Sequence, residues 1–312
     1  MTELRLGVLS AATLSPRARQ RLELAADAGL DHVGSIDHVC FHGSQGVDGL
    51  ITAALLAGAH PTLSLYIGVY LLPLRHPVAV ARQLATLAAF APGRLTFGVG
   101  IGGEDPHEFA SCGVDVTTRG RRTDESLYLL RRLLAGELVS FNGEFTGLDD
   151  TRILPTPSPP IPLVVGGRSD AAARRAGRLG DGWIGVFNSP ARYQAVVDLV
   201  EYEAAAAKRS VPEWRHAMEI WCSFGADQER AHRRLAVIME RFYGLPFAPF
   251  ERYCPIGTPE RVAEAIAPYL EAGCRTFNLI PVAASVEEAI TNAGRVRSLL
   301  AAGHTPITST GT

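Results

Sequence analysis

The chain lacks the features that mark disulfide-rich, metal-binding or membrane-spanning proteins. Its five cysteines are scattered and form no C-x-x-C pair, so neither a disulfide framework nor a thiolate zinc site is expected. Its nine histidines show no H-x-H or H-E-x-x-H spacing, which argues against a metal-dependent hydrolase. No apolar run reaches membrane-spanning length, and the opening "MTELRLGVLS" has no apolar segment followed by a cleavage site. We therefore expect a soluble, cytoplasmic protein with no metal and no membrane partner.

Neither sign of charge is in excess. The 30 Lys and Arg residues are balanced by 32 Asp and Glu residues, which gives a formal net charge of −2. A chain without a net positive field does not attract nucleic acid or an anionic membrane, so neither is expected as the main partner. Of the 312 residues, 47% are hydrophobic, which is enough for a large α/β core. We expect a small-molecule substrate.

Short apolar stretches alternate with longer amphipathic segments along almost the whole chain. Eight stretches have the composition of buried strands, at 4–10, 31–39, 63–72, 94–102, 161–167, 181–187, 216–225 and 275–282. Eight strand-then-helix units are the number that closes a parallel barrel, so the pattern predicts an α/β fold, a (β/α)8 TIM barrel. An open doubly wound sheet is the alternative, but it predicts two halves with a break in composition, and the sequence shows none.

Three segments do not fit the repeating pattern of a strand followed by a helix. They predict insertions at the C-terminal ends of strands. They span about 103–120, 137–160 and 242–257. The second contains Asn142-Gly143 between strand-like runs, which is a hairpin signal, and the third is rich in aromatic residues and proline, so we expect it to be irregular. Residues 1–303 are expected to form one domain, and the polar end 304–312 a flexible tail.

The stretch "LTFGVGIGGEDPHEF" (95–109) has the spacing G-x-G-x-x-G at Gly98, Gly100 and Gly103. In a dinucleotide-binding turn, the third glycine opens a helix that faces the pyrophosphate. Here Pro106 argues against a helix directly after the motif. We therefore interpret the glycines as the end of a barrel strand, where a flat ligand can approach the backbone. Packing inside the barrel is the alternative, and it is strongest for Gly98.

A better anion site follows the fifth strand-like stretch, in "VVGGRS" (164–169). Gly166 and Gly167 predict a turn, Ser169 is placed to cap the next helix, and Arg168 lies between them. Backbone N–H groups at such a helix start bind phosphate. A tight turn that simply requires glycine is the alternative.

Asp37 and His38 close the second strand-like stretch, at the rim where barrel enzymes form their sites. An imidazole there can exchange a proton with a substrate hydroxyl or carbonyl while a hydride moves. Side chains alternate along a strand, so only one of the two is expected to face the pocket. A hydrogen-bonded pair that closes the strand is the alternative.

Several of these stretches together resemble the bacterial-luciferase-like oxidoreductases. The resemblance is carried by "DHV" (37–39), by the segment 71–125 around the glycine motif, and by "PIPLVVGGRSDAAARRAGRLGDGWIG" (160–185), and it covers most of residues 4–187. It implies a (β/α)8 barrel that uses FMN or the deazaflavin coenzyme F420. The modest length and the place of "DHV" are more similar to the F420-dependent branch. The resemblance also implies a homodimer.

The resemblance implies roles for single residues. His38 and Glu104 would be catalytic, with His38 as the acid/base group, and Asp37 would lie beside the ring. A non-proline cis peptide bond is implied at Val69–Tyr70, where the backbone would bulge against the ring. The residues expected to bind the coenzyme are Asp37, Val69, Tyr70, Gly102, Gly103, Val165, Gly166, Gly167, Arg168 and Ser169.

The last third of the chain matches the family only at the level of the fold. Its aromatic residues Phe242, Tyr243, Phe247 and Phe250 fit an apolar lid over a substrate, and equally a subunit interface. Similar enzymes that act on sugar phosphates have a lysine shortly after the "DGWI" strand. The segment "VFNSPARY" (186–193) has none, so a phosphorylated sugar is not expected.

These observations predict an oxidoreductase that transfers a hydride between F420 and a small organic alcohol, carbonyl compound or activated double bond. An FMN-dependent monooxygenase that uses dioxygen is the alternative within the same family. A flavin-binding protein without catalytic activity is the alternative from a different class, and the intact Asp37-His38 pair argues against it.

Overall fold

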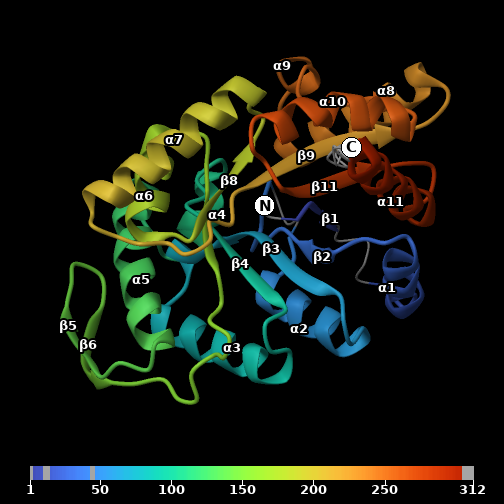
Figure 1. The fold of residues 1–312 in the computed structure, drawn as a ribbon. Coiled ribbons are helices and arrows are strands. Elements are labelled where there is room, and N and C mark those ends of the chain that lie inside the picture. Colours follow the sequence, from blue (N-terminus) through green and yellow to red (C-terminus); the bar gives the residue numbers. More distant parts are fainter. Residues whose placement is uncertain (1–2, 10–14, 43–45, 304–312) are drawn as a thin grey trace, which may run out of the picture.

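Eight parallel strands close into a barrel in the computed structural model, which describes residues 3–9, 15–42 and 46–303 (Figure 1). Around the barrel they follow in the order β1 (Arg5–Leu9), β2 (His32–Ser35), β3 (Ser64–Leu71), β4 (Leu95–Gly100), β7 (Leu163–Gly166), β8 (Gly182–Val186), β9 (Ala217–Phe224) and β11 (Thr276–Val282). Strand β11 pairs back with β1 and closes the ring. The (β/α)8 barrel is confirmed, and each predicted stretch contains one barrel strand.

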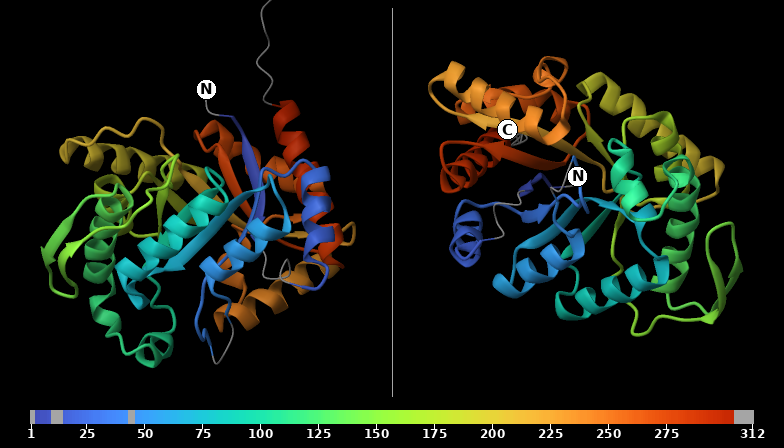
Figure 2. Two further views of the ribbon diagram at one scale, coloured as in Figure 1. Left: turned by 90° about the horizontal axis from the view of Figure 1, so that it is seen from below. Right: turned by 180° about the vertical axis from the view of Figure 1, so that it is seen from behind.

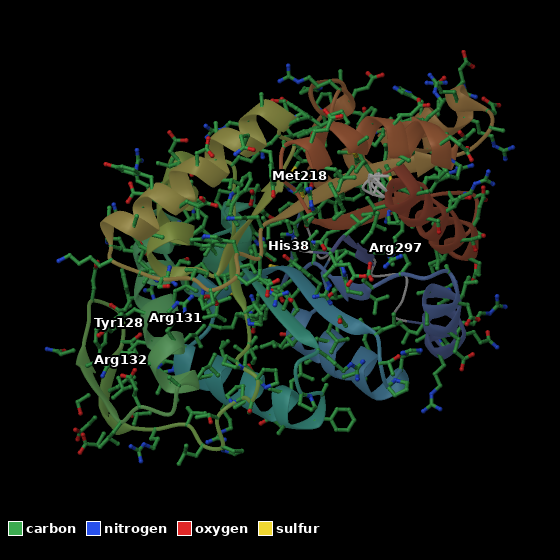
Figure 3. All side chains as sticks on the ribbon, in the orientation of Figure 1. His38, Tyr128, Arg131, Arg132, Met218 and Arg297 are labelled. Atoms are coloured by element: carbon green, nitrogen blue, oxygen red, sulfur yellow. The ribbon has the colours of Figure 1, made fainter. Side chains whose placement is uncertain are left out.

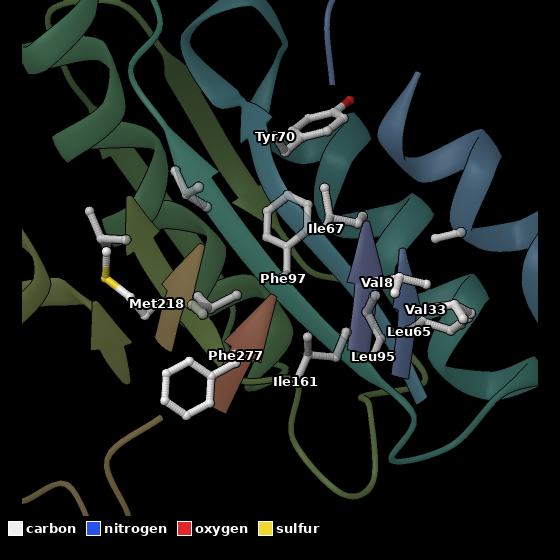
Figure 4. Close-up of a cluster of buried hydrophobic side chains, with 14 of the residues drawn as sticks. Val8, Val33, Leu65, Ile67, Tyr70, Leu95, Phe97, Ile161, Met218 and Phe277 are labelled. Atoms are coloured by element: carbon white, nitrogen blue, oxygen red, sulfur yellow. The ribbon is translucent and has the colours of Figure 1, made fainter. Parts of the chain in front are cut away.

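Helices surround the barrel and cover its outer face (Figure 1). They are α1 (Ala18–Asp27), α2 (Gly49–Ala59), η2 (Leu72–Leu74), α3 (Pro77–Phe90), α5 (Arg119–Leu134), α6 (Asp170–Leu179), α7 (Pro190–Ala206), α8 (Gln228–Tyr243), α10 (Pro259–Glu271) and α11 (Val286–Gly303). Outward side chains of the strands, such as Val8, Val33, Leu65 and Phe97, pack against these helices in the main core (Figure 4). The expected tail 304–312 lies outside the described residues.

A small apolar layer fills the inside of the barrel. Its members are Leu9, Tyr66, Val164, Ile184 and Ala217. Glycines give them room, since a Cβ on Gly34 would lie 2.9 Å from Cδ2 of Leu9, and one on Gly98 would lie 2.8 Å from Cδ1 of Ile184. Packing therefore accounts for Gly98. The layer forms a floor below the C-terminal ends of the strands.

The first two of the expected insertions form a hairpin and short helices. The hairpin is present as β5 (Val139–Asn142) and β6 (Gly147–Thr151), an antiparallel pair at the outer edge of the molecule (Figure 1). The first insertion contains α4 (Pro106–Ser111) and η3 (Val116–Thr118). The expectation that Pro106 prevents a helix was wrong. Proline needs no N–H partner in a first turn, and the Asp105 carboxylate caps the helix by accepting the N–H of His107 at 3.0 Å.

The third insertion is only partly irregular. Helix α8 continues to Tyr243, and Gly244 ends it with a φ of 65°. A short helix α9 (Ala248–Glu251) and a two-residue strand β10 (Ile256–Gly257), paired with β9, follow. Phe242 and Tyr243 therefore lie at the end of a helix, and not in an irregular segment as expected.

The C-terminal ends of all eight strands share one end of the barrel, because the strands are parallel. In the left view of Figure 2, the segment after β2, the segment around α4 and the end of α8 come together at this end. Residues far apart in the chain are thus brought to one place, which is where barrel enzymes build their sites.

Candidate active site

A cavity lies at the C-terminal end of the barrel, above the apolar layer. Its wall combines glycine backbone, apolar and aromatic side chains, and a few titratable groups. The titratable side chains on the wall are Asp37, His38, Glu104, Glu219 and Tyr243. None of the described residues that line it is a lysine or an arginine.

His38 is held at this cavity by a buried carboxylate. Its Nδ1 lies 3.2 Å from Oε2 of Glu108, and its ring stacks on Phe41 with the centroids 4.0 Å apart. A carboxylate only accepts hydrogen bonds, so Nδ1 carries the proton and Nε2 is left for a ligand. Figure 3 shows His38 near the middle of the ring of helices.

Glu108 was not among the predicted site residues. It is almost fully buried, and its Oε1 also accepts the backbone N–H groups of Val39 at 2.6 Å and Cys40 at 3.3 Å. Burial alone would raise the pKa of Glu108, but the bonds from His38 and from the two N–H groups hold that pKa below its ordinary value. Glu108 is therefore ionised at neutral pH and fixes both His38 and the chain that follows it.

Asp37 is buried beside the cavity, and its oxygens are already bound. Its carboxylate accepts the N–H groups of Gly49 at 2.9 Å and Leu71 at 3.0 Å, and it pairs with Arg75 at 2.9 Å. Burial raises the pKa of Asp37, while Arg75 and the two N–H groups act against that rise. Asp37 thus joins the segment after β2 to α2 and to the end of β3, and it shapes the site through these bonds.

Glu104 borders the cavity from the segment between β4 and α4, and it is exposed. The two glycines before it, Gly102 and Gly103, have φ values of 57° and 104°, a region that glycine enters without strain. A Cβ on Gly103 would also lie 2.6 Å from Nε of Arg119. Gly102 and Gly103 therefore determine the backbone path that brings Glu104 to the rim of the cavity.

Strand β3 contains a cis peptide bond at Gly68–Val69, one bond before the Val69–Tyr70 position that the resemblance implied, and that implication was wrong. The register between β3 and β4 shifts at this point, because β3 holds one extra residue. Val69 borders the cavity. The ring of Tyr70 packs in the core, 5.3 Å from the ring of Phe97 and below the guanidinium of Arg75.

The expected anion cradle has a strand, a glycine turn and a helix start. Gly166 and Gly167 border the cavity at the end of β7. Ser169 caps α6, and its Oγ accepts the N–H of Ala172 at 3.3 Å. The first N–H groups of α6 have no acceptor inside the helix, as at any helix start, so they are suited to an anion.

Two of the four lid candidates border the cavity. The ring of Phe242 lies 5.7 Å from that of Trp221, and Tyr243 Oη accepts the indole N–H of Trp221 at 3.2 Å. Phe247 is buried, and the ring of Phe250 stacks on that of Tyr243, with the ring centroids 5.4 Å apart. The end of α8 therefore forms this part of the wall.

The other predicted residues do not border the cavity. Val165 is buried in the main core, and Arg168 is exposed. The predicted site residues that the structure leaves away from the cavity wall are Tyr70, Gly103, Val165, Arg168, Ser169, Phe247 and Phe250.

Glu219 is a cavity residue that the sequence analysis missed. It lies on β9, and no hydrogen bond from a described residue reaches its carboxyl. Burial raises the pKa of Glu219 to about 8, so the carboxyl is mostly protonated at neutral pH. A signal was available, since Glu219 is the one charged residue in the strand sequence AMEIWCSF.

Metal and membrane features can be assessed over residues 3–9, 15–42 and 46–303. Within these ranges, no three His, Cys, Asp or Glu side chains are placed together as a metal site would require. No helix of the same part of the chain is long and apolar enough to cross a membrane. The five cysteines are unbridged.

The sequence matches known proteins over most of its length. A family model described as luciferase-like monooxygenase matches residues 8–253. An uncharacterized protein of Mycobacterium tuberculosis is 33% identical over 178 residues, which are 57% of this chain and 61% of that protein, so the match spans less than two thirds of that relative. An F420-dependent glucose-6-phosphate dehydrogenase of Mycobacterium avium is 31% identical over 243 residues, 74% of this chain and 72% of the relative.

Solved structures share the fold. An F420-dependent secondary alcohol dehydrogenase in complex with an F420-acetone adduct has a TM-score of 0.84 at 22% identity, over 96% of this chain and 99% of that one. The monooxygenase RslO1 from Streptomyces bottropensis has a TM-score of 0.79 at 25% identity, over the same shares. Both structural alignments cover 96% of this chain, so they show the barrel fold outside residues 8–253 as well, where the family model does not match.

Proposed function

Since this chain belongs to the luciferase-like monooxygenase family, we propose that it is an oxidoreductase that transfers a hydride between coenzyme F420 and a small, uncharged organic substrate. The substrate would be an alcohol, a carbonyl compound or an activated double bond. The relatives named F420-dependent glucose-6-phosphate dehydrogenases support the choice of coenzyme. The observation that carries the proposal is the His38–Glu108 pair at the cavity, because hydride transfer to or from an oxygen-bearing carbon needs a proton-carrying group beside it.

The cavity fits a flat ring joined to a phosphate-bearing chain. Part of its wall is glycine backbone, at Gly68, Gly100 and Gly166, and a Cβ on Gly166 would lie 2.7 Å from Cγ1 of Val69. A ring can approach the backbone closely where no side chain intervenes. Gly167 leads from this wall to the capped start of α6, whose N–H groups suit a phosphate.

His38 would carry the proton of the reaction. Bound F420 would supply or accept the hydride. With Nδ1–H held by Glu108, Nε2 of His38 takes the proton from a substrate hydroxyl, or returns it to a carbonyl oxygen in the opposite direction. The Glu108 carboxylate stabilises the imidazolium that forms. Glu104, at the rim, is the second group that we propose for proton transfer.

The charge of the wall argues for an uncharged substrate. Asp37, Glu104 and Glu219 are the acidic groups there, and no described lining residue is a cation. Glu219 is mostly protonated and Asp37 is paired with Arg75, but a phosphate or carboxylate on the substrate would still lose water without gaining a Lys or Arg counter-ion. We therefore do not extend the glucose 6-phosphate activity of the relatives to this chain.

An FMN-dependent monooxygenase is the second candidate. The likeness to the monooxygenase RslO1, the more identical of the two solved structures compared above, favours it. This function would use the same cavity but would require dioxygen and FMN, and no substrate alcohol would be oxidised. Coenzyme choice and the need for dioxygen therefore separate the two candidates.

Three further features stay predictions. The homodimer and the cytoplasmic location rest on the resemblance and on composition. The single domain over residues 1–303 rests on the repeat of strands and helices along the sequence.

Turnover under nitrogen tests the proposed function. Purified protein with F420 is mixed with a panel of uncharged alcohols, and with reduced F420 and a panel of ketones, while the absorbance of the ring is followed. We expect turnover without dioxygen, no turnover of glucose 6-phosphate, and a loss of about 10²- to 10⁴-fold in kcat for His38→Ala with coenzyme binding retained. Turnover that needs dioxygen and FMN would favour the second candidate. An unchanged kcat in His38→Ala would remove His38 from the reaction.

A further inference from the structure

Glu219 is an acidic residue that the proposed reaction does not use. It lies on β9 between Ala217 and Trp221, whose side chains belong to the barrel interior and to the cavity wall, while Met218 and Ile220 point into the outer core. Placing a carboxyl group at an inward position of an apolar strand is unfavourable unless the group finds a partner. The inward position of Glu219 therefore suggests that a ligand bonds to its carboxyl group.

The carboxyl group of Glu219 lies at the floor of the cavity, beside the bulge of β3. A Cβ built on Gly68 would come 3.3 Å from Oε2 of Glu219, so the carboxyl faces the Gly68–Val69 peptide. The same Cβ would lie 2.8 Å from Cδ1 of Leu9 and 3.6 Å from Cδ1 of Tyr66, which belong to the apolar layer. Glu219 thus sits where the apolar layer ends and the cavity begins.

The surroundings of Glu219 favour its neutral form. Burial raises the pKa of Glu219 to about 8. The titratable groups that face it are Tyr66 from β3 and Tyr243 from α8, and the wall further carries Asp37, His38 and Glu104. The described part of the wall offers no Lys or Arg to stabilise the carboxylate. At neutral pH, Glu219 therefore presents an O–H group that no described residue accepts.

We propose that Glu219 positions the coenzyme ring, by donating a hydrogen bond from its protonated carboxyl to an acceptor atom on the ring edge that reaches the cavity floor. This inference rests on the proposed function, because it takes a flat ring with carbonyl acceptors to lie over Gly68–Val69. A neutral acid suits the place, since it can border an apolar layer and still donate. An ionised carboxylate would repel the same carbonyl oxygens.

Coenzyme binding should then depend on pH. Below about pH 8 the donor is present, and the Kd should change little with pH. Above it, each binding event must return a proton to the carboxyl, so the Kd should increase by up to about tenfold per pH unit. Conversely, bound coenzyme should raise the pKa of Glu219 further.

Fluorescence titrations with F420, and in parallel with FMN, from about pH 6 to about pH 9 test the inference on the full chain. Glu219→Gln keeps an N–H donor and does not titrate, so we expect a Kd within about threefold of wild type near pH 6.5 and no alkaline weakening. Glu219→Leu has no donor and should bind about three- to tenfold more weakly near pH 6.5. Glu264→Gln is the matched control, because it removes an exposed carboxyl from helix α10, away from the cavity wall, and should keep the wild-type alkaline weakening.

The outcomes separate this inference from the proposed function. A wild-type Kd that does not respond to pH, or a Glu219→Gln variant that weakens in parallel with wild type, would overturn the inference and leave the coenzyme assignment intact. Binding of neither coenzyme at any pH would overturn both. Thermal melts establish that each variant is folded. Carbon-13 NMR of labelled glutamate gives a readout that does not depend on affinity, namely a carboxyl that titrates near pH 8 and is absent from Glu219→Gln. If no carboxyl titrates there, the inference fails.

Discussion

His38 Nδ1 lies 3.2 Å from the carboxylate of Glu108, and 70 positions separate the two residues in the sequence. The same carboxylate accepts the backbone N–H of Val39, so one buried group orients the imidazole and the chain that carries it. The stacked ring of Phe41 covers the imidazole from one side. His38 is therefore pre-positioned, with Nε2 as the nitrogen available to a ligand.

Glu108→Gln should reduce turnover more than it reduces coenzyme binding. The amide keeps the shape of the side chain but lacks the negative charge that stabilises an imidazolium. We expect kcat to fall about 10- to 100-fold, with a coenzyme Kd within about threefold of wild type. Because Glu108 acts through His38, the double variant with His38→Ala should lose no more activity than His38→Ala alone. Steady-state kinetics of the four proteins measure this, and additive losses would contradict the pairing.

Glu219→Gln should gain stability relative to wild type as the pH rises from about 5 to about 8. The folded-state pKa of about 8 lies above the ordinary value of 4.5, so the folded protein binds more protons than the unfolded chain between these two values. The contribution of Glu219 to stability is full below the ordinary value and is lost as the pH rises through the folded one. Glutamine does not titrate, so the Tm difference should grow by a few degrees over this window. Calorimetry measures it, and a constant difference would mean that Glu219 titrates normally.

Gly166→Ala should weaken coenzyme binding. Its Cβ would lie 2.7 Å from Cγ1 of Val69 and would add a methyl group to the wall against which we place the ring. We expect the Kd to increase at least about tenfold, with a loss of about 1–3 kcal/mol in the free energy of unfolding. Gly147→Ala on the hairpin is the control, since nothing lies within 4 Å of its Cβ, and it should change neither by much. A normal Kd in Gly166→Ala would place the ring elsewhere.

The barrel itself was predictable because its signals are local. Each strand is a short apolar run followed by an amphipathic helix, and Asn142-Gly143 indicated the hairpin, whose loop is 143–146. The cap of α6 by Ser169 was equally visible in "VVGGRS". The expectation that Pro106 prevents a helix was also wrong for a local reason. Proline interrupts a helix only beyond its first turn, and here Pro106 begins one.

The polar part of the site was predictable where a residue follows the end of a strand. His38 and Glu104 follow strand ends, and the structure brings both to the cavity. Glu108 and Glu219 act through neighbours that are distant in sequence, so their surroundings depend on how the barrel closes. The position of the cis bond depends on the register between β3 and β4, which no single strand specifies.

A parallel titration of the coenzyme-free protein with F420 and with FMN, near neutral pH and followed by ligand fluorescence, tests the central claim most directly. We predict that F420 binds with a Kd in the micromolar range or below, and that FMN binds at least about tenfold more weakly. A preference for FMN would contradict the assignment of F420, and binding of neither would contradict the proposed use of the cavity.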